Sequence, residues 1–399
     1  MARTNSLSAT IFNHPPYRLR TSIILYLRFM RICYGIILAV FLFLIYKFQH
    51  QASAGIASGS GEVFRFPETR STYDRMENYL KIYIYRDRDP GAYFQSPREL
   101  TGMYGSEAYF FKNIKESRFL TTNPLKAHLF FIPISWHQMR TRGTSYEKMI
   151  TIVENYVQGL ISKYPFWNRT DGANHFFLIC HDIGLEVAEG VPVFIKKNLI
   201  RLVCPATYET HSLPFRDIPL PPVNQSFSHP PGGNDLFHVN SLHPWAGIPN
   251  SKIRASLEQQ WKDVTELESE RVWNDTAEGY LLLHDKIHRT KFCICPHGFP
   301  ANTALIADSI RYGCIPVIFT NYMDYPFADT LDWKKFSIVL GEDEVIQLKD
   351  TLKGIREADF TVMQNNLRKV QKHFQWNSPP LRYDAFNMVL YDLSVLTNV

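Results

Sequence analysis

The chain has 399 residues, of which 45% are hydrophobic and 20% are charged, an ordinary composition for a folded globular protein. Its net charge of +5 is small for this length and lies partly in the first 31 residues, so the charge does not indicate a nucleic-acid partner. The 28 Phe and 21 Tyr residues suit both packed cores and surfaces that stack on sugars or bases, and composition does not separate these uses.

The N-terminus contains an uncharged apolar run, Ile32–Tyr46. Extended backwards it reaches the roughly 20 residues that a membrane-spanning helix needs. Arginines precede this run, and the positive-inside rule then keeps the N-terminus cytoplasmic. We therefore expect a cytoplasmic tail over 1–21, a transmembrane signal-anchor over 22–47, a stem over 48–78 and a lumenal body. A cleaved signal peptide is the alternative.

Two further patterns agree with a lumenal body. Glycosylation sequons begin at Asn168, Asn224 and Asn274, although such triplets also arise by chance. Five cysteines follow the apolar run, so at least one of them must remain unpaired within the chain. Cys180 and Cys204 form a plausible disulfide in an oxidising compartment.

The body alternates short apolar runs with amphipathic helical patterns. The first such runs are 81–87, 127–135 and 175–182, and the segment 213–235, rich in Pro, Gly and Ser, resembles an interdomain linker. Later runs lie at 236–242, 291–295, 315–319 and 336–340. This alternation predicts an α/β fold with parallel strands in two Rossmann-like domains, over 79–225 and 236–372, followed by C-terminal helices over 373–399 that pack back on the first domain.

One strand–loop–helix–strand unit deserves chemical interpretation. No G-x-G-x-x-G motif follows the first strand, which makes a dinucleotide dehydrogenase a poor hypothesis. After the strand at 291–295, Asn302 or Thr303 can cap a helix that Gly313 ends. The N-terminus of such a helix suits a phosphate, and Asp308 could accept hydrogen bonds from a ribose. An ion pair with Arg311 on the same helix is an equally good interpretation of Asp308.

A metal site is not expected. Cys293, Cys295 and His297 are close in sequence, but they are only three possible ligands and lie on or beside one strand, which favours buried strand cysteines.

The stretch "KFCICPHGFPANTALIADSIRYGCIPVIF", with "YGSEAYFFKNIKESRFL" and "WAGIPNSKIRASL" before it, resembles the exostosin-like domain of plant glycosyltransferase family 47. The resemblance covers about 81–393. It implies a GT-B fold and metal-independent, inverting transfer from a nucleotide sugar, UDP-linked, with no other cofactor. It also implies a Golgi membrane location and a wall polysaccharide acceptor such as xyloglucan, xylan or pectin. Asp308 would then lie beside the donor nucleotide.

Inverting transfer needs a base for the acceptor hydroxyl and positive charge or N–H donors on the departing diphosphate. His181 and Asp182, at a predicted strand end, are candidates for the base, unless they only cap a turn. Glu107 is a third candidate, because the matching family motif carries an acid there. The donor would be bound by residues near two helix starts, Gly247, Asn250, Ser251, Lys252 and Arg254 in one and His297, Gly298, Asn302, Thr303, Asp308 and Arg311 in the other. A solvated helix face is the alternative for the first group.

Two positions depart from the family pattern. Pro249 and Leu305 stand where related sequences often carry arginine. Losing two cations beside a diphosphate would weaken donor binding. A second hypothesis is therefore a catalytically weak or inactive partner that retains or stabilises an active Golgi glycosyltransferase.

Overall fold

The computed structural model describes residues 63–65, 69–86, 100, 105–204, 217–223, 241–243, 252–261, 287–296, 304–319 and 325–399. The predicted cytoplasmic tail and signal-anchor lie outside these ranges. Among the described helices, none combines the length and the apolar character needed to cross a membrane.

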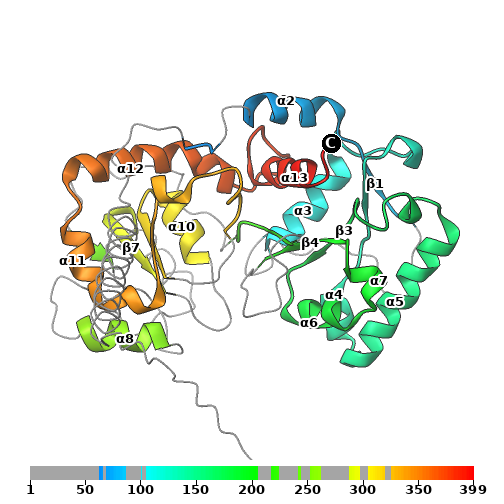
Figure 1. Cartoon of the computed structure of the whole chain (residues 1–399), viewed down its shortest axis with the longest axis horizontal. Coiled ribbons are helices and arrows are strands. Elements are labelled where there is room, and N and C mark those ends of the chain that lie inside the picture. Colours follow the sequence, from blue (N-terminus) through cyan, green and yellow to red (C-terminus); the bar gives the residue numbers. More distant parts are fainter. Residues whose placement is uncertain are drawn as a thin grey trace, which may run out of the picture. The chain divides into compact units, whose positions relative to one another are not determined.

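The first sheet has five parallel strands in the order in which they occur in the chain (Figure 1). Its strands are β1 (Ile82–Ile84), β2 (Leu129–Phe131), β3 (His175–Ile179), β4 (Ile200–Val203) and β5 (Asp217–Pro219). The intervening helices are α3 (Gly105–Glu116), α4 (Trp136–Thr141), α5 (Tyr146–Lys163), α6 (Asp182–Gly190) and α7 (Val193–Lys196).

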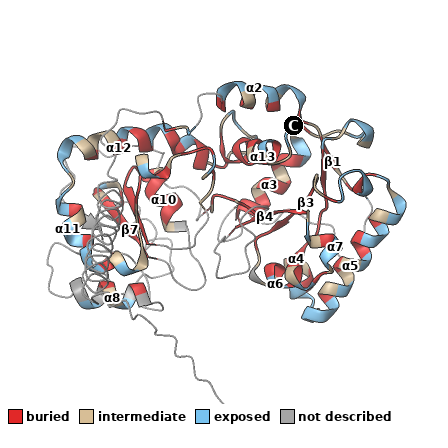
Figure 2. Ribbon diagram, viewed as in Figure 1, coloured by how far each residue is buried: buried red, intermediate tan, exposed pale blue. Residues whose placement is uncertain are grey.

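Both faces of this sheet are covered, because successive strand residues alternate between two apolar clusters. Phe131, Phe176 and Leu178 pack in the cluster that includes residues of α3. Phe130 and Phe177 pack in the other cluster, with Met149 and Val153 of α5. Strands buried on both faces form continuous apolar runs, as the sequence has here, and Figure 2 shows these strands buried.

The second sheet has four parallel strands, β6 (Ser241–His243), β7 (Thr290–Cys295), β8 (Ile315–Phe319) and β9 (Ile338–Leu340). Helix α10 (Ala304–Tyr312) connects β7 to β8. The other α-helices described after the first sheet are α8 (Lys252–Trp261), α11 (Leu348–Lys353), α12 (Glu357–Val370) and α13 (Ala385–Leu396). The predicted α/β class with parallel strands is confirmed.

Helix α2 (Thr69–Tyr79) belongs to the folded body, although the sequence analysis places residues up to 78 in the stem. Its Tyr73 is fully buried and stacks on Tyr383, with ring centroids 4.1 Å apart. Thr72 Oγ1 and the Tyr391 hydroxyl of α13 lie 2.7 Å apart in a hydrogen bond. Aromatic packing and hydrogen bonds to distant residues therefore fix a segment whose own sequence is polar.

The predicted linker 213–235 also contains structure, because β5 pairs with β4 at the edge of the first sheet. Arg201 on β4 donates to both carboxylate oxygens of Asp217 on β5, at 2.6 and 2.8 Å, and both side chains are buried. Burial alone would lower the pKa of Arg201, but the hydrogen bonds and charge of Asp217 and Glu189 raise it. This ion pair anchors a proline-containing strand at a position where proline is tolerated.

Two disulfides brace the sheets. Cys180–Cys204 connects the residues that follow β3 and β4, as the sequence suggested. Cys293–Cys314 connects β7 to the residue before β8. Cys295 is a buried free thiol, and burial raises its pKa to about 12. Since Cys293 is disulfide-bonded, the pair Cys293 and Cys295 does not offer two thiolates to a metal.

Candidate functional site

The first three strands of the first sheet each lead into a helix whose opening residues carry polar side chains. Glu107 lies in the first turn of α3, after β1, and His137 in the first turn of α4, after β2. His181 precedes α6, after β3, and Asp182 is the first residue of that helix. Because the three strands are parallel, these helix starts lie along one edge of the sheet, where ligands of open α/β sheets bind.

His181 caps α6 with its ring. Its Nδ1 accepts a hydrogen bond from the Ile183 N–H at 3.3 Å. This contact uses the Nδ1 lone pair, so the neutral ring carries its proton on Nε2. In this tautomer the ring has no lone pair left for proton abstraction. The side chain of Asp182 lies outside the described part of the structure.

His137 is a neighbour that the sequence analysis missed. Its ring centroid lies 5.9 Å from that of His181, with the ring planes 36° apart. The rule that selected His181, a polar residue after a buried strand, would also have selected His137. His137 follows the predicted apolar run 127–135 by two residues.

Tight packing sets the spacing of the two histidines. The Trp136 indole, beside His137, is fully buried and donates to the Leu178 carbonyl at 2.7 Å. A Cβ atom at Gly184 of α6 would lie 2.7 Å from Ile179 and 2.9 Å from Trp136. Glycine at 184 therefore allows α6 to approach α4 and β3 closely enough to bring His181 beside His137.

Glu107 is placed differently from the two histidines. Its side chain is 1% exposed, inside the first turn of α3. The neighbouring Ser106 donates to the Pro221 carbonyl at 2.7 Å, which fixes this turn against the segment after β5. The carboxylate of Glu107 is thus near the correct edge of the sheet but enclosed, whereas a base must reach the proton that it abstracts.

In the second sheet, Asp308 is 3% exposed on α10 and is therefore not part of a surface ion pair. Burial lowers the pKa of the Arg311 guanidinium, and the negative charge of Asp308 partly opposes this lowering. It also adds to the burial that raises the pKa of Tyr312. Both interpretations of Asp308, as partner of Arg311 and as acceptor for a ligand hydroxyl, are compatible with this position.

Arg311 of α10 interacts with two tyrosines, Tyr312 of its own helix and Tyr109 of α3. Its guanidinium carbon lies 5.9 Å from the Tyr312 ring centroid. Burial raises the pKa of Tyr109 on α3, and the charge of Arg311 partly opposes this rise. Tyr109 stacks on Trp376, with ring centroids 6.0 Å apart. The charge of Arg311 is therefore felt at Tyr109, which lies two residues after Glu107 in α3.

Most of the predicted donor residues lie, in full or in their side chains, outside the described part of the structure. Lys252 and Arg254 belong to α8, but their side chains lie outside the described residues, as do Gly247, Asn250, Ser251, His297, Gly298, Asn302 and Thr303 in full. Leu305 is half-buried and packs against the main apolar cluster. Of the sequons, Asn168 is exposed on a short 3₁₀ helix, and Asn224 and Asn274 lie outside the description. No cluster of possible metal ligands occurs among the described residues.

The sequence is similar to a known protein family. The model of the exostosin GT47 domain matches residues 76–355. A probable glycosyltransferase of Arabidopsis thaliana is 31% identical over 333 residues, covering 81% of this chain and 63% of that relative. The chain thus spans less than two thirds of that protein's length. A second probable glycosyltransferase of the same plant is 31% identical, over 84% of this chain and 72% of the relative.

A more distant relative carries a more specific name. The probable glucuronoxylan glucuronosyltransferase of Arabidopsis thaliana is 25% identical over 360 residues, covering 80% of this chain and 78% of the relative. The family match spans more than half of the chain and includes β1 to β9, α3 and α10. The chain belongs to the exostosin GT47 family.

Proposed function

We propose that this chain is a Golgi type II membrane glycosyltransferase, with its catalytic body in the lumen. It moves a sugar from a nucleotide sugar, UDP-linked, to a cell-wall polysaccharide, with inversion at the anomeric carbon. Membership of the exostosin GT47 family is the observation that carries this proposal. The two parallel sheets would be the two halves of a GT-B fold, with the acceptor at the first sheet and the donor at the second.

On the acceptor side, we assign Asp182 as the base that takes the proton from the attacking hydroxyl. Its backbone position beside His181 places it at the carboxyl edge of the sheet. His181, whose Nδ1 caps α6, would help to orient the same hydroxyl through its ring. His137 lies close enough to contribute to this pocket. Glu107 is enclosed and supports the helix start.

On the donor side, charge builds on the diphosphate as the glycosidic bond to the nucleotide breaks. Donors placed in advance on that charge lower the barrier. The start of α10 and the start of α8 would supply backbone N–H groups and the cations Lys252 and Arg254. Asp308 would accept hydrogen bonds from the ribose. The reaction would use no divalent metal, because these donors take its role.

The name of one relative bears on the identity of the acceptor and of the transferred sugar. One relative is named a probable glucuronoxylan glucuronosyltransferase, which favours a xylan acceptor and a glucuronic acid donor. Xyloglucan and pectin are the other wall polysaccharides that we consider. A few pocket side chains suffice to discriminate between sugars, so the sugar itself must be measured.

The test is to incubate the detergent-solubilised full-length chain with a panel of UDP-sugars, with and without xylan, xyloglucan and pectin fragments. We expect donor hydrolysis with one sugar, faster turnover with one acceptor and no loss of activity in EDTA. The Asp182→Asn variant is the matched control. Absence of binding and hydrolysis across the whole panel would refute the activity.

Leu305 supports the second candidate, a weak or inactive partner of an active Golgi glycosyltransferase. Its side chain packs against the apolar cluster at the position where related sequences often place a cation. Rescue of a knockout plant by a double variant, Asp182→Ala with Asp308→Ala, would favour this candidate. Loss of rescue at normal protein levels would favour the enzyme.

A further inference from the structure

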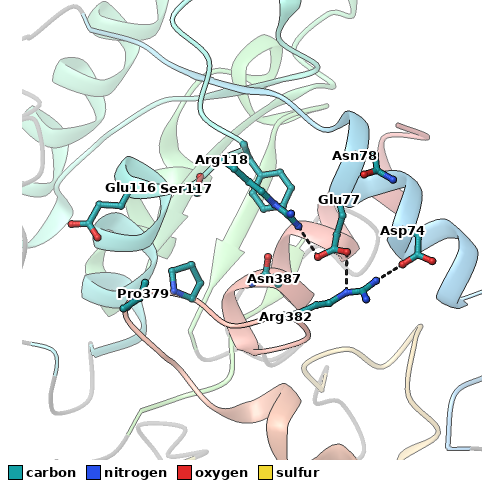
Figure 3. A pocket seen from close by; sticks show the side chains of 11 residues that line it. Asp74, Glu77, Asn78, Glu116, Ser117, Arg118, Pro379, Arg382 and Asn387 are labelled. Carbon is teal, nitrogen blue, oxygen red and sulfur yellow. Dashed lines mark hydrogen bonds and ion pairs between the residues drawn. The ribbon is translucent and has the colours of Figure 1, made fainter.

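A groove of about 700 Å³ lies at the amino ends of the strands of the first sheet. His137 and His181 follow the carboxyl ends of the strands, at the opposite side. Its walls come from the end of α2, the end of α3 and the segment before α13, and they include Asn78, Ser117 and Pro379 (Figure 3). The residues after α3 bond to the first residue of β1, with Ile82 N–H donating to the Phe119 carbonyl at 2.8 Å. The groove therefore lies at the amino end of β1.

A fixed ion-pair network forms one side of the groove. Glu77 of α2 lies between two arginines that point towards it (Figure 3). Arg118 donates to one Glu77 oxygen at 2.6 Å, and Arg382 Nε donates to the other at 2.9 Å. Arg382 also pairs with Asp74, and its guanidinium lies 4.8 Å from the Tyr383 ring centroid. Arg382 thus contacts two carboxylates, whereas Arg118 contacts one.

These groups offer alternating donors and acceptors to a ligand. A guanidinium carries several N–H donors in a rigid fork, and Arg118 has a side chain 60% exposed to solvent. The lining contains three carboxylates, Asp74, Glu77 and Glu116, against two arginines, so the groove carries a net negative charge. That charge disfavours nucleotides and uronate chains. A neutral ligand rich in hydroxyl groups, each of which donates and accepts, matches the set.

The apolar residues of the groove fit the same class of ligand. Pro379 and Pro380 line it and can contact the C–H faces of sugar rings. Phe119 also lines the groove. A volume of this size accommodates a ligand as large as a short oligosaccharide.

We propose that this groove is a second saccharide-binding site, which holds a neutral segment of the polysaccharide away from the reacting end. The choice of a polysaccharide rests on the proposed function, but binding at the groove is independent of catalysis. Holding a polymer at two places raises the effective concentration of its reacting end.

The test is a calorimetric titration of the full-length chain with three oligosaccharides of equal length. These are xylohexaose, cellohexaose and an oligogalacturonate. Arg118→Gln removes a groove guanidinium from an exposed ion pair. Arg356→Gln is the matched control, because Arg356 is 72% exposed and pairs with Asp359, and neither residue lines the groove. Asn78→Trp, an exposed position, fills the groove without touching the ion pairs. Melting curves check that each variant folds.

We expect one neutral hexasaccharide to bind, Arg118→Gln to weaken it about tenfold and Arg356→Gln to leave it unchanged. Turnover of polymer should fall in Arg118→Gln and Asn78→Trp, while donor hydrolysis stays constant. The proposal is overturned if no neutral hexasaccharide binds, if both groove variants bind normally, or if the oligogalacturonate binds as tightly. Saccharide binding without donor hydrolysis would leave the groove in place and refute the enzymatic activity alone.

Discussion

Strand β3 has a histidine at each end, and the two differ in almost every property. His175 begins the strand, fully buried, with its Nε2 hydrogen-bonded to the Tyr85 hydroxyl at 2.9 Å and its ring stacked on Phe130. His181 follows the strand, half-buried, and caps α6. The same side chain thus packs the core at one edge of the sheet and faces the proposed acceptor site at the other, and burial decides between these uses.

The largest expected effect is at the His181 end. Asp182→Asn removes the proposed base but keeps the size of the side chain, and we expect kcat to fall by about 10²–10⁴. His181→Asn keeps a capping side chain and loses the imidazole ring, so its effect should be smaller. Kinetics with the preferred donor and acceptor measure both. A normal kcat in Asp182→Asn, at an unchanged melting temperature, would remove Asp182 from the mechanism.

At the His175 end we expect an effect on stability rather than on kcat. Burial lowers the pKa of His175 to about 3, against the ordinary value of 6.5 in the unfolded chain. Above pH 6.5 both states are neutral and the full stability is present. As the pH falls below 6.5, only the unfolded state binds the proton, so stability is lost progressively towards pH 3.

The expected loss from His175 at pH 5 is about 2 kcal/mol of unfolding free energy. Denaturant unfolding at pH 5 and pH 7 of the wild type and of His175→Gln measures it. Other buried groups, such as His373 with a pKa of about 4 and Asp392 with a pKa of about 8, titrate in both proteins and cancel in the difference. Equal pH dependence in the two proteins would contradict the assignment to His175.

A third prediction concerns Gly184, which allows α6 to pack closely against β3 and α4. Gly184→Ala would ordinarily favour a helix, but here the new methyl group meets Ile179 and Trp136 at under 3 Å. We expect a loss of about 1–3 kcal/mol in stability, with a lower kcat because α6 carries His181 away from His137. Gly159→Ala in α5, where a Cβ atom meets nothing within 4 Å, is the control and should be neutral or stabilising.

Apolar runs in the sequence correctly predicted the strands whose burial requires such runs. The apolar runs at 127–135, 175–182 and 315–319 contain β2, β3 and β8, because strands of covered parallel sheets need unbroken apolar sequence. Strand β5 was assigned to a linker, since it is held by the ion pair between Arg201 and Asp217 rather than by its own composition. Helix α2 was missed for a similar reason, because Tyr73 packs on residues near the C-terminus.

In the candidate site, too, the position of residues along the chain was predictable, but their contacts with distant groups were not. The strand-end rule selected His181 and Asp182, but the sequence could not show that the cap occupies His181 Nδ1. That contact depends on the rotamer of one ring and on the backbone N–H of Ile183. Nor could the sequence show that Glu107 is enclosed while Asp182 begins a helix at the edge of the sheet. Burial of Glu107 and the capping hydrogen bond of His181 are what the structure adds to the choice among the three candidates for the base.

The smallest expected effect tests the missed neighbour. His137→Gln keeps a polar side chain near His181, and we expect kcat to fall only about tenfold, because His137 lies beside His181 and is not the proposed base. If His137 helps to place the acceptor, KM for the polysaccharide should rise while donor hydrolysis in water stays constant. Equal losses in transfer and in hydrolysis would instead make His137 a support of the fold around α4. The separation of the two rates therefore decides whether the acceptor site extends from β3 to β2.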